Sequence, residues 1–241
     1  MKLRLLAPYP EEMNIYADRG NIIFLRRRCE WRGIGFDYEA AGPGEGFDPA
    51  DHDFLYVGGG QDRDQRLVAA DMVRSKRDAL AAAVDDGAVL LAVCGGYQLL
   101  GHSYQLGDER IEGLGLADLE TVREPGPRLI GNVAIEADLG GGPQLVAGFE
   151  NHGGRTTLGA AAMPLGRVLK GHGNDGRSGQ EGARQGDVIG TYLHGPLLPK
   201  NAWFADWLIA RALAIEAAEL APLDDRIERA AHLGARRAAG V

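Results

Sequence analysis

The sequence has few cysteines and no long apolar segment. Its two cysteines, Cys29 and Cys94, are 65 positions apart, so they form neither a disulfide framework nor a Cys-x-x-Cys zinc motif. No run of 18 apolar residues occurs, which excludes a membrane-spanning segment. The first residues, Met1 to Pro8, are interrupted too early by polar residues to form a signal peptide. These absences indicate a reduced, cytoplasmic protein without a metal site.

Positive charge is also scarce. The chain has 26 basic and 34 acidic residues, a net charge of −8, which argues against nucleic acid or an anionic membrane as its main partner. No Gly-x-x-x-x-Gly-Lys-[Ser/Thr] phosphate-binding loop occurs among the four lysines, Lys2, Lys76, Lys170 and Lys200. We therefore expect no cofactor in this chain and place any ATP-dependent step on another polypeptide.

Glycine, in contrast, is abundant, with 36 residues in 241. No Gly-X-Y period or Gly/Ser tract organises these glycines, which excludes collagen and a flexible linker. They form short clusters between apolar segments, at positions 58–60, 95–96, 140–142 and 153–154. This placement predicts turns at which the backbone approaches another group closely.

Apolar segments and helical patterns alternate along the first hundred residues, which predicts an α/β fold with a mostly parallel central sheet flanked by helices. The expected strands are residues 3–7, 53–57 and 88–93, and the expected helices are 21–32, 65–85 and 97–104. Gly33 follows the first helix as its C-terminal stop.

The second half has more strands than helices, which predicts additional antiparallel strands there. Strands are expected at 131–136, 145–150, 167–170 and 187–193, and two final helices at 200–214 and 224–236. The polar, glycine-rich stretch 171–186 is predicted to be an exposed loop. The length fits one domain over residues 1–241, with a core of about 3–200 and C-terminal helices at about 200–236.

The most informative segment surrounds Cys94. A buried strand leads into this cysteine, and a helix follows Gly95 and Gly96, which is the strand–turn–helix context of a nucleophile elbow. Ala92 and Gly96 provide the small neighbours that the elbow requires, and the helix N-terminus favours a thiolate. The alternative, a buried and inert cysteine, is the interpretation that we keep for Cys29, which lies at a core-facing helical position.

A thiol nucleophile needs a base, and the chain has six histidines: His52, His102, His152, His172, His194 and His232. His194 follows a predicted strand and precedes Gly195-Pro196, so it projects from a sheet edge, although a structural histidine is the alternative. His152 also follows a strand end and is the second choice. His172 in the polar loop and His232 on the final helix are expected in solvent.

Around these residues the sequence resembles the class I, or triad-type, glutamine amidotransferases. Ala92-Val93-Cys94-Gly95-Gly96-Tyr97-Gln98 resembles the cysteine motif of their cobyric acid synthase-like branch, and Gly190-Thr191-Tyr192-Leu193-His194-Gly195 resembles the histidine motif. Three further segments are similar to the GatD family, the glutaminase subunits of lipid II isoglutaminyl synthase. They are Tyr16-Ala17-Asp18-Arg19-Gly20-Asn21-Ile22, Glu30-Trp31-Arg32-Gly33 and Gly148-Phe149-Glu150-Asn151-His152-Gly153-Gly154-Arg155-Thr156.

The resemblance implies a glutaminase that hydrolyses L-glutamine through a Cys94 thioester, with His194 as acid and base. Gly59, Gly60 and Gly95 are the expected oxyanion donors, although a plain strand-to-helix turn would also explain glycines 58–60. Arg128 matches a glutamine-binding arginine of the family, and Gln98 is expected in the same pocket. Asn151 and His152 are further candidates.

The resemblance also implies a partner. GatD proteins act with MurT, a Mur-ligase-like subunit that binds ATP and magnesium and amidates the D-glutamate of lipid II in peptidoglycan synthesis. One departure stands out, because Pro196 replaces the glutamate that usually orients the histidine, and Ala92 replaces the first glycine of the elbow. We expect the orienting carboxylate from elsewhere in the chain or from the partner, and weak activity in the isolated chain.

Three alternatives remain at this point. The glutaminase could serve a cobyrinate-type or other small-molecule acceptor, the elbow could belong to another thiol hydrolase such as a γ-glutamyl peptidase, or the chain could be an inactive subunit.

Overall fold

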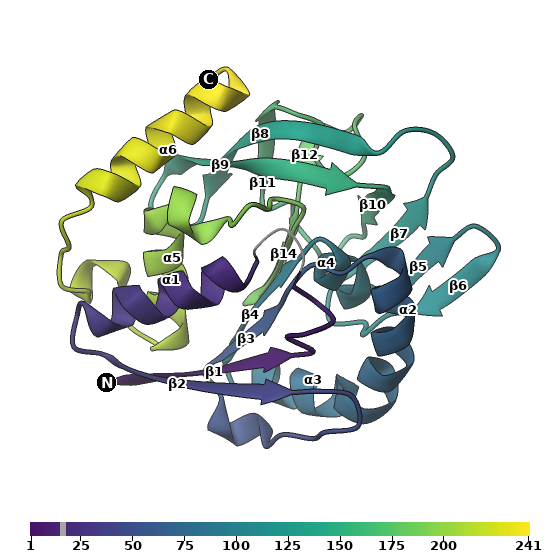
Figure 1. Cartoon of the computed structure of the whole chain (residues 1–241), viewed down its shortest axis with the longest axis horizontal. Coiled ribbons are helices and arrows are strands. Elements are labelled where there is room, and N and C mark those ends of the chain that lie inside the picture. The colour runs from purple at the N-terminus through teal and green to yellow at the C-terminus, as the bar shows by residue number, and fades with distance from the viewer. Residues whose placement is uncertain (15–17) are drawn as a thin grey trace.

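The computed structural model describes residues 1–14 and 18–241 (Figure 1). Tyr16 and Ala17 of the first family segment lie outside the described residues. The centre of the molecule is a six-stranded sheet in the order β13-β14-β4-β3-β1-β2, in which β13 alone is antiparallel to its neighbour. Its strands are β1 (Lys2–Pro8), β2 (Gly35–Ala41), β3 (Phe54–Val57), β4 (Val89–Val93), β13 (Ala183–Gln185) and β14 (Val188–Thr191). The α/β fold with a mostly parallel sheet is confirmed.

Helices cover both faces of this sheet (Figure 1). The connection from β1 to β2 runs through α1 (Arg19–Glu30). The connection from β3 to β4 runs through α2 (Asp62–Asp71), the short π-helix η3 (Met72–Lys76) and α3 (Arg77–Asp85). The two connections step in opposite directions along the sheet, so right-handed crossovers place their helices on opposite faces. Helix α5 (Ala202–Ala212) packs beside α1.

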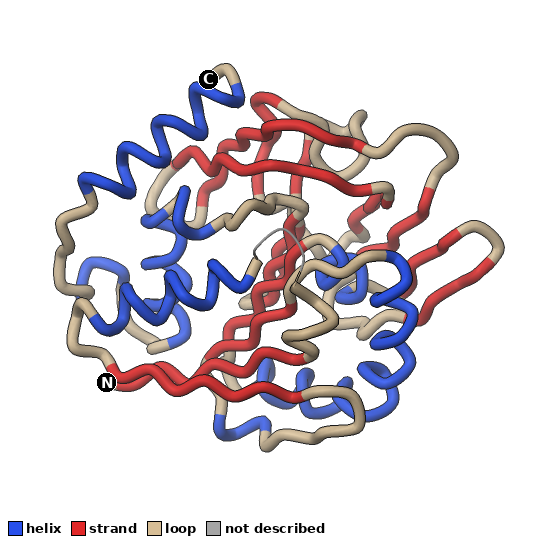
Figure 2. Tube along the Cα trace, in the orientation of Figure 1, coloured by secondary structure: helices blue, strands red, loops and turns tan. Residues whose placement is uncertain are grey.

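Two further sheets of four strands each are built from strands that come after residue 100, and Figure 2 shows the strands in red. One has the order β10-β7-β5-β6 and the other β12-β11-β8-β9. Their strands are β5 (Ser103–Leu106), β6 (Glu109–Glu112), β7 (Leu119–Arg123), β8 (Leu129–Asp138), β9 (Pro143–His152), β10 (Gly154–Leu158), β11 (Gly166–Lys170) and β12 (Gln180–Glu181). The additional antiparallel strands expected in this half are confirmed.

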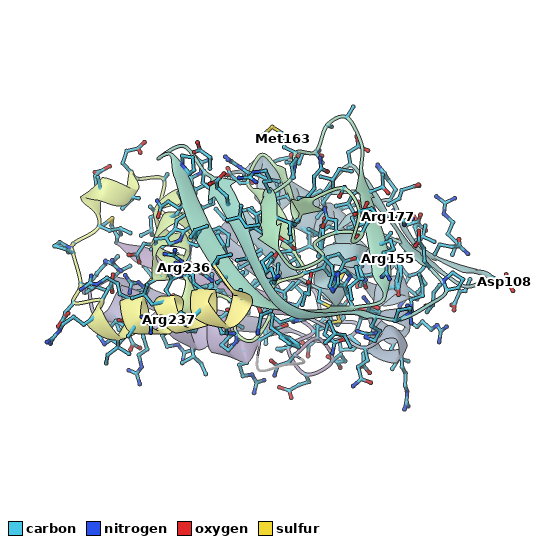
Figure 3. All side chains as sticks on the ribbon, turned by 90° about the horizontal axis from the view of Figure 1, so that it is seen from above. Asp108, Arg155, Met163, Arg177, Arg236 and Arg237 are labelled. Atoms are coloured by element: carbon cyan, nitrogen blue, oxygen red, sulfur yellow. The ribbon has the colours of Figure 1, made fainter. Side chains whose placement is uncertain are left out.

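The remaining helices are short or terminal. They are α4 (Gly95–Leu100), η2 (Pro49–Asp51), η4 (Leu198–Lys200), η5 (Ala217–Glu219) and α6 (Arg226–Ala239). Helix α6 packs on β8 and β9, and Figure 3 shows its Arg236 and Arg237 in the left half of the view, with Asp108 of the β5–β6 turn at the right-hand tip. No helix in the described part of the chain is long and apolar enough to cross a membrane.

Several sequence predictions were wrong in detail. The helix expected at 97–104 ends at Leu100, because the chain turns at Gly101 into β5. The helix expected at 65–85 is interrupted by η3, where the buried Lys76 ammonium donates to Asp71 and to the Gly42 carbonyl. Strand β2 and the strands between 103 and 123 were not predicted, because β2 is mostly exposed and lacks an apolar run.

The stretch 171–186 is not simply an exposed loop. It contains β12 and β13, and it buries Asn174 and Glu181 completely or nearly so. The glycine-rich sequence did not predict these strands and buried residues, because several of the glycines adopt positive φ in tight turns between short strands.

Candidate active site

The carboxyl ends of four parallel strands meet at one edge of the central sheet, where the direction of the crossovers reverses. This is the usual place for a site in an open α/β sheet. Glycines 58–60 follow β3, Cys94 follows β4 and His194 follows β14, while the segment after β1 leads to Asp18 at the start of α1. The edge therefore gathers a thiol, an imidazole and a carboxylate.

Cys94 occupies a strained turn between β4 and α4. Its φ and ψ are 48° and −102°, a conformation that non-glycine residues rarely adopt. The flanking glycines are required by close packing, since a Cβ on Gly96 would lie 2.7 Å from the Val57 carbonyl oxygen and one on Gly95 would lie 2.7 Å from the Gly60 nitrogen. The elbow expected from the sequence is present.

His194 lies three residues after the end of β14 and is held in place by a backbone bond to β9. Its backbone N–H donates to the Phe149 carbonyl oxygen at 2.7 Å, and the residue is fully buried. Its Nδ1 lies 3.4 Å from Asp18 Oδ2. Burial acts to lower the pKa of His194, but the Cys94 thiolate and the Asp18 carboxylate outweigh burial and raise the pKa to about 10. At neutral pH the His194 imidazole is therefore charged, and it faces the Cys94 side chain.

Asp18 is the carboxylate that sequence reasoning did not assign. It stands at the N-cap of α1, yet its side chain makes no capping bond and turns instead toward His194 and the Gly59 N–H, which donates to Oδ2 at 3.0 Å. The position of the missing glutamate, Pro196, packs against α1, since a Cβ on Gly20 would lie 2.8 Å from Pro196 Cγ. The one available signal was that Asp18 lies in a family segment.

The three glycines expected to stabilise an oxyanion are not equivalent. The Gly59 N–H is used by Asp18, so in this arrangement Gly59 holds the carboxylate in place. Gly60 and Gly95 lie against each other beside Cys94, because the position of a Cβ on Gly95 is 2.7 Å from the Gly60 nitrogen. These two residues remain the candidates for donors to an oxyanion.

Gln98 is buried within a protein network. Its Oε1 accepts from Gln65 Nε2 at 2.6 Å, and its Nε2 donates to the Tyr192 hydroxyl at 3.2 Å. The Tyr192 hydroxyl also bonds to the Thr156 hydroxyl at 2.7 Å. Gln98 therefore connects α2 and α4 with the segment that follows β14, which suits a positioning role better than direct contact with substrate.

His152 is an internal residue. Its Nδ1 donates to the Gly154 carbonyl oxygen at 2.8 Å, its Nε2 lies 3.9 Å from Glu150, and its ring stacks on Tyr192 with centroids 3.5 Å apart. Burial lowers the pKa of His152, so the ring is neutral at pH 7. These contacts place His152 in the protein interior, so His194 is the histidine that faces Cys94.

Arg128 and Asn151 form a pair at the start of β8. The Arg128 guanidinium donates to the Asn151 side-chain oxygen at 2.7 Å and to its backbone oxygen at 2.6 Å. Arg128 is exposed, and Asn151 lies on β9, one residue before this strand ends at His152. The pairing orients the guanidinium that the family resemblance assigns to the glutamine carboxylate.

The other histidines and Cys29 lie away from the catalytic edge. His52 contacts Glu39 and the Asp48 carbonyl, and the exposed His102 pairs with Asp118. His172 is exposed as expected, but His232 is half-buried, because its Nδ1 donates to the Lys200 carbonyl oxygen. Burial raises the pKa of the Cys29 thiol to about 12, which fits an inert core cysteine.

Within residues 1–14 and 18–241, no group of three or more His, Cys, Asp or Glu side chains is arranged to hold a metal ion.

Comparison with known sequences places the chain in a family. Residues 4–202 match the CobB/CobQ-like glutamine amidotransferase domain. The chain is 40% identical over 203 residues to the GatD subunit of lipid II isoglutaminyl synthase (glutamine-hydrolyzing) from Staphylococcus aureus, a match that covers 84% of this chain and 81% of that protein. The GatD subunit from Streptococcus pneumoniae is 36% identical over 213 residues, with 88% and 81% covered.

More distant relatives share parts of the chain or its fold. Cobyric acid synthase from Brucella anthropi is 41% identical over 122 residues, which cover 48% of this chain and 23% of that protein. The PurLQS structure from Thermotoga maritima has a TM-score of 0.57 at 19% identity, covering 80% of this chain and 88% of that one. A glutamine amidotransferase from the same organism has a TM-score of 0.55 at 16% identity, covering 99% and 94%.

The two solved structures support the fold alone, whereas the sequence matches extend over most of the chain. The chain belongs to the CobB/CobQ-like glutamine amidotransferases and, within them, to the family of GatD subunits.

Proposed function

We propose that the chain is the glutaminase subunit of a lipid II isoglutaminyl synthase, with Cys94 as nucleophile. The observation that carries this proposal is the strained Cys94 elbow beside His194, whose imidazole is charged and backed by Asp18. A thiolate–imidazolium pair at the carboxyl edge of a parallel sheet is suited to attack an amide carbon.

The reaction proceeds in two stages. The Cys94 thiolate attacks the side-chain amide carbon of glutamine, and the imidazolium of His194 donates a proton to the departing ammonia. A γ-glutamyl thioester remains. His194, now neutral, removes a proton from water, and the resulting hydroxide attacks the thioester carbon and displaces the Cys94 thiolate. Glutamate is released, its acid proton passes to solvent, and the thiolate and imidazolium are restored.

The surrounding residues orient and stabilise. Asp18 holds His194 through Nδ1 and favours its charged form. The N–H groups of Gly60 and Gly95 are the donors for the oxyanion that develops on the amide oxygen. Arg128, held by Asn151, binds the α-carboxylate of glutamine.

The acceptor and partner follow from the GatD relatives, which are named as subunits of lipid II isoglutaminyl synthase. A MurT-like, ATP-dependent subunit that carries ATP and magnesium activates the D-glutamate carboxyl of lipid II, and ammonia from this chain amidates it. Ammonia is protonated in bulk water, so docking of the two subunits shelters its transfer. Because a reactive thiolate persists under reducing conditions, we place this reaction in the cytoplasm.

The decisive test uses the copurified complex. Cys94→Ala should abolish glutamine-dependent amidation of lipid II while ammonium salts still support amidation at the wild-type rate. Cys29→Ala is the matched control and should leave both activities unchanged, since Cys29 lies in the core. Wild-type glutamine-dependent activity in Cys94→Ala would refute the proposal.

A small-molecule acceptor is the second candidate, favoured by the partial match to cobyric acid synthase. The two candidates share the glutaminase chemistry and differ in the acceptor. Supplying the complex with glutamine, ATP and either lipid II or a cobyrinate-type acid distinguishes them, because only the true acceptor should gain an amide.

A further inference from the structure

The chain leaves the central sheet before it reaches His194. Strand β14 ends at Thr191, so the backbone N–H groups of the next three residues need partners other than the sheet ladder. His194 itself bonds to Phe149 on β9. The N–H groups of Tyr192 and Leu193 are bound instead by side chains, and both residues are fully buried.

Glu181 supplies this side-chain support. Its Oε1 accepts from the Tyr192 N–H at 2.6 Å, and each of its carboxyl oxygens lies 3.1 Å from Thr191 Oγ1. The Thr191 hydroxyl in turn accepts from the Leu193 N–H at 3.0 Å. Glu181 and Thr191 together therefore replace the missing sheet hydrogen bonds over the two residues before His194.

The position of Glu181 is itself fixed by the residues next to it. It belongs to β12, which pairs with β11, and the next residue, Gly182, is bracketed by the Asn174 side chain through bonds of 2.9 Å and 2.8 Å. A Cβ on Gly182 would lie 2.6 Å from the Gly190 carbonyl oxygen, so this turn packs directly on β14. The position of Glu181 is therefore fixed by strand pairing, by hydrogen bonds and by close packing on β14.

The carboxyl group is suited to this task in its neutral form. Burial, assisted by the Glu150 carboxylate of β9, raises the pKa of Glu181 to about 8, while the bonds from Tyr192 and Thr191 oppose the rise. Tyr97 of α4 also faces it. The Tyr192 N–H and the Thr191 hydroxyl both donate to Oε1 of Glu181, and the side-chain oxygen of a glutamine can accept the same two bonds.

We propose that Glu181 is a positioning residue for His194. Glu181 holds the imidazole in place beside Cys94 through Thr191 and the backbone of Tyr192 and Leu193. Small errors in the placement of a catalytic base lower the rate steeply. This inference rests on the proposed hydrolysis of glutamine at Cys94.

The test compares four variants in the copurified complex with glutamine as substrate. Glu181→Ala and Thr191→Val remove the bonds to the chain before His194, and each should lower kcat about 10- to 100-fold while the KM for glutamine changes less than about twofold. Glu181→Gln and Thr191→Ser keep the bonds and should restore kcat to near the wild-type value. Alkylation of Cys94 by 6-diazo-5-oxonorleucine should slow in parallel with kcat.

The controls separate positioning from general damage. Glu136→Ala removes a half-buried glutamate of β8 that pairs with Arg167, and it should leave kcat unchanged. Circular dichroism and thermal unfolding identify folded variants, and Thr191→Val carries the test alone if Glu181→Ala does not fold. Wild-type kcat in a folded Glu181→Ala or Thr191→Val, or failure of Glu181→Gln to restore kcat, would overturn the inference. Cys94→Ala tests the proposed function separately, because hydrolysis that survives that substitution would remove the nucleophile itself.

Discussion

At the scale of single residues, the site depends on a few groups in unusual states. Cys94 holds a strained backbone conformation, and the His194 imidazole is charged although it is fully buried. Asp18 balances that charge and also binds the Gly59 N–H. Each feature is costly for a folded chain and is explained by the chemistry that it serves.

Replacing Asp18 with asparagine tests its role as the orienting carboxylate. Asp18→Asn keeps the size of the side chain but removes its charge, so the pKa of His194 should fall and kcat should drop at least about 100-fold. Steady-state kinetics and the pH dependence of Cys94 alkylation measure these effects. Asp53→Asn is the matched control. It breaks the ion pair between Asp53, which lies just before β3, and Arg4 of β1. An unchanged kcat in Asp18→Asn would indicate that a partner supplies the carboxylate.

At the scale of elements, α1 is the piece that places Asp18. Its position depends on a buried ionic cluster, in which the fully buried Arg28 guanidinium pairs with Asp206 of α5 and with Asp225 just before α6. Arg32 reinforces the cluster by pairing with Asp206 as well. The cluster joins three helical regions that lie far apart in the sequence.

Arg28→Ala should therefore destabilise the protein strongly. The substitution leaves Asp225 without its partner and Asp206 with Arg32 alone, and we expect a loss of about 3–5 kcal/mol in the free energy of unfolding. Arg27→Ala breaks only an exposed pair with Glu30, three residues further along α1, and should cost less than about 1 kcal/mol. Urea unfolding of both variants measures the difference, and equal losses would contradict the special role of the cluster.

At the scale of the whole molecule, the buried groups make stability depend on pH. The pKa of His194 is raised to about 10 and that of Glu181 to about 8 in the folded state. Both groups therefore bind protons more tightly in the folded chain than in the unfolded chain. Their contributions are complete below the unfolded pKa values, about 6.5 for histidine and 4.5 for glutamate, and are lost as pH rises through the folded values.

The free energy of unfolding should accordingly fall as pH increases from about 5 to 10. One pKa unit corresponds to about 1.4 kcal/mol, so ionisation of Glu181 removes several kcal/mol. Glu181→Gln should flatten the part of the curve below pH 8, whereas Glu136→Gln should not. Urea unfolding at several pH values compares the three proteins, and a wild-type curve in Glu181→Gln would contradict the assignment of that slope.

The sequence determined the local features of this protein. The apolar runs that end at Val57 and Val93 predicted buried parallel strands, and the small residues around Cys94 predicted the elbow, because both depend on neighbours within a few positions. The clusters at 58–60 and 95–96 were interpreted as points of close approach, and the structure shows Gly60 and Gly95 in contact.

Only the tertiary structure decided which distant residues serve Cys94 and His194. Asp18 lies 176 positions from His194 in the sequence, and Glu181 lies in a stretch whose glycines and polar residues predict an exposed loop. The residues next to Asp18 and Glu181 in the sequence do not indicate which groups these carboxyl groups contact, because those contacts come from distant segments of the chain. The strand order brings the carboxyl ends of β1, β4 and β14 to one edge of the sheet. That arrangement places the glycines at 58–60 and 95–96 and the acids Asp18 and Glu181 around one site.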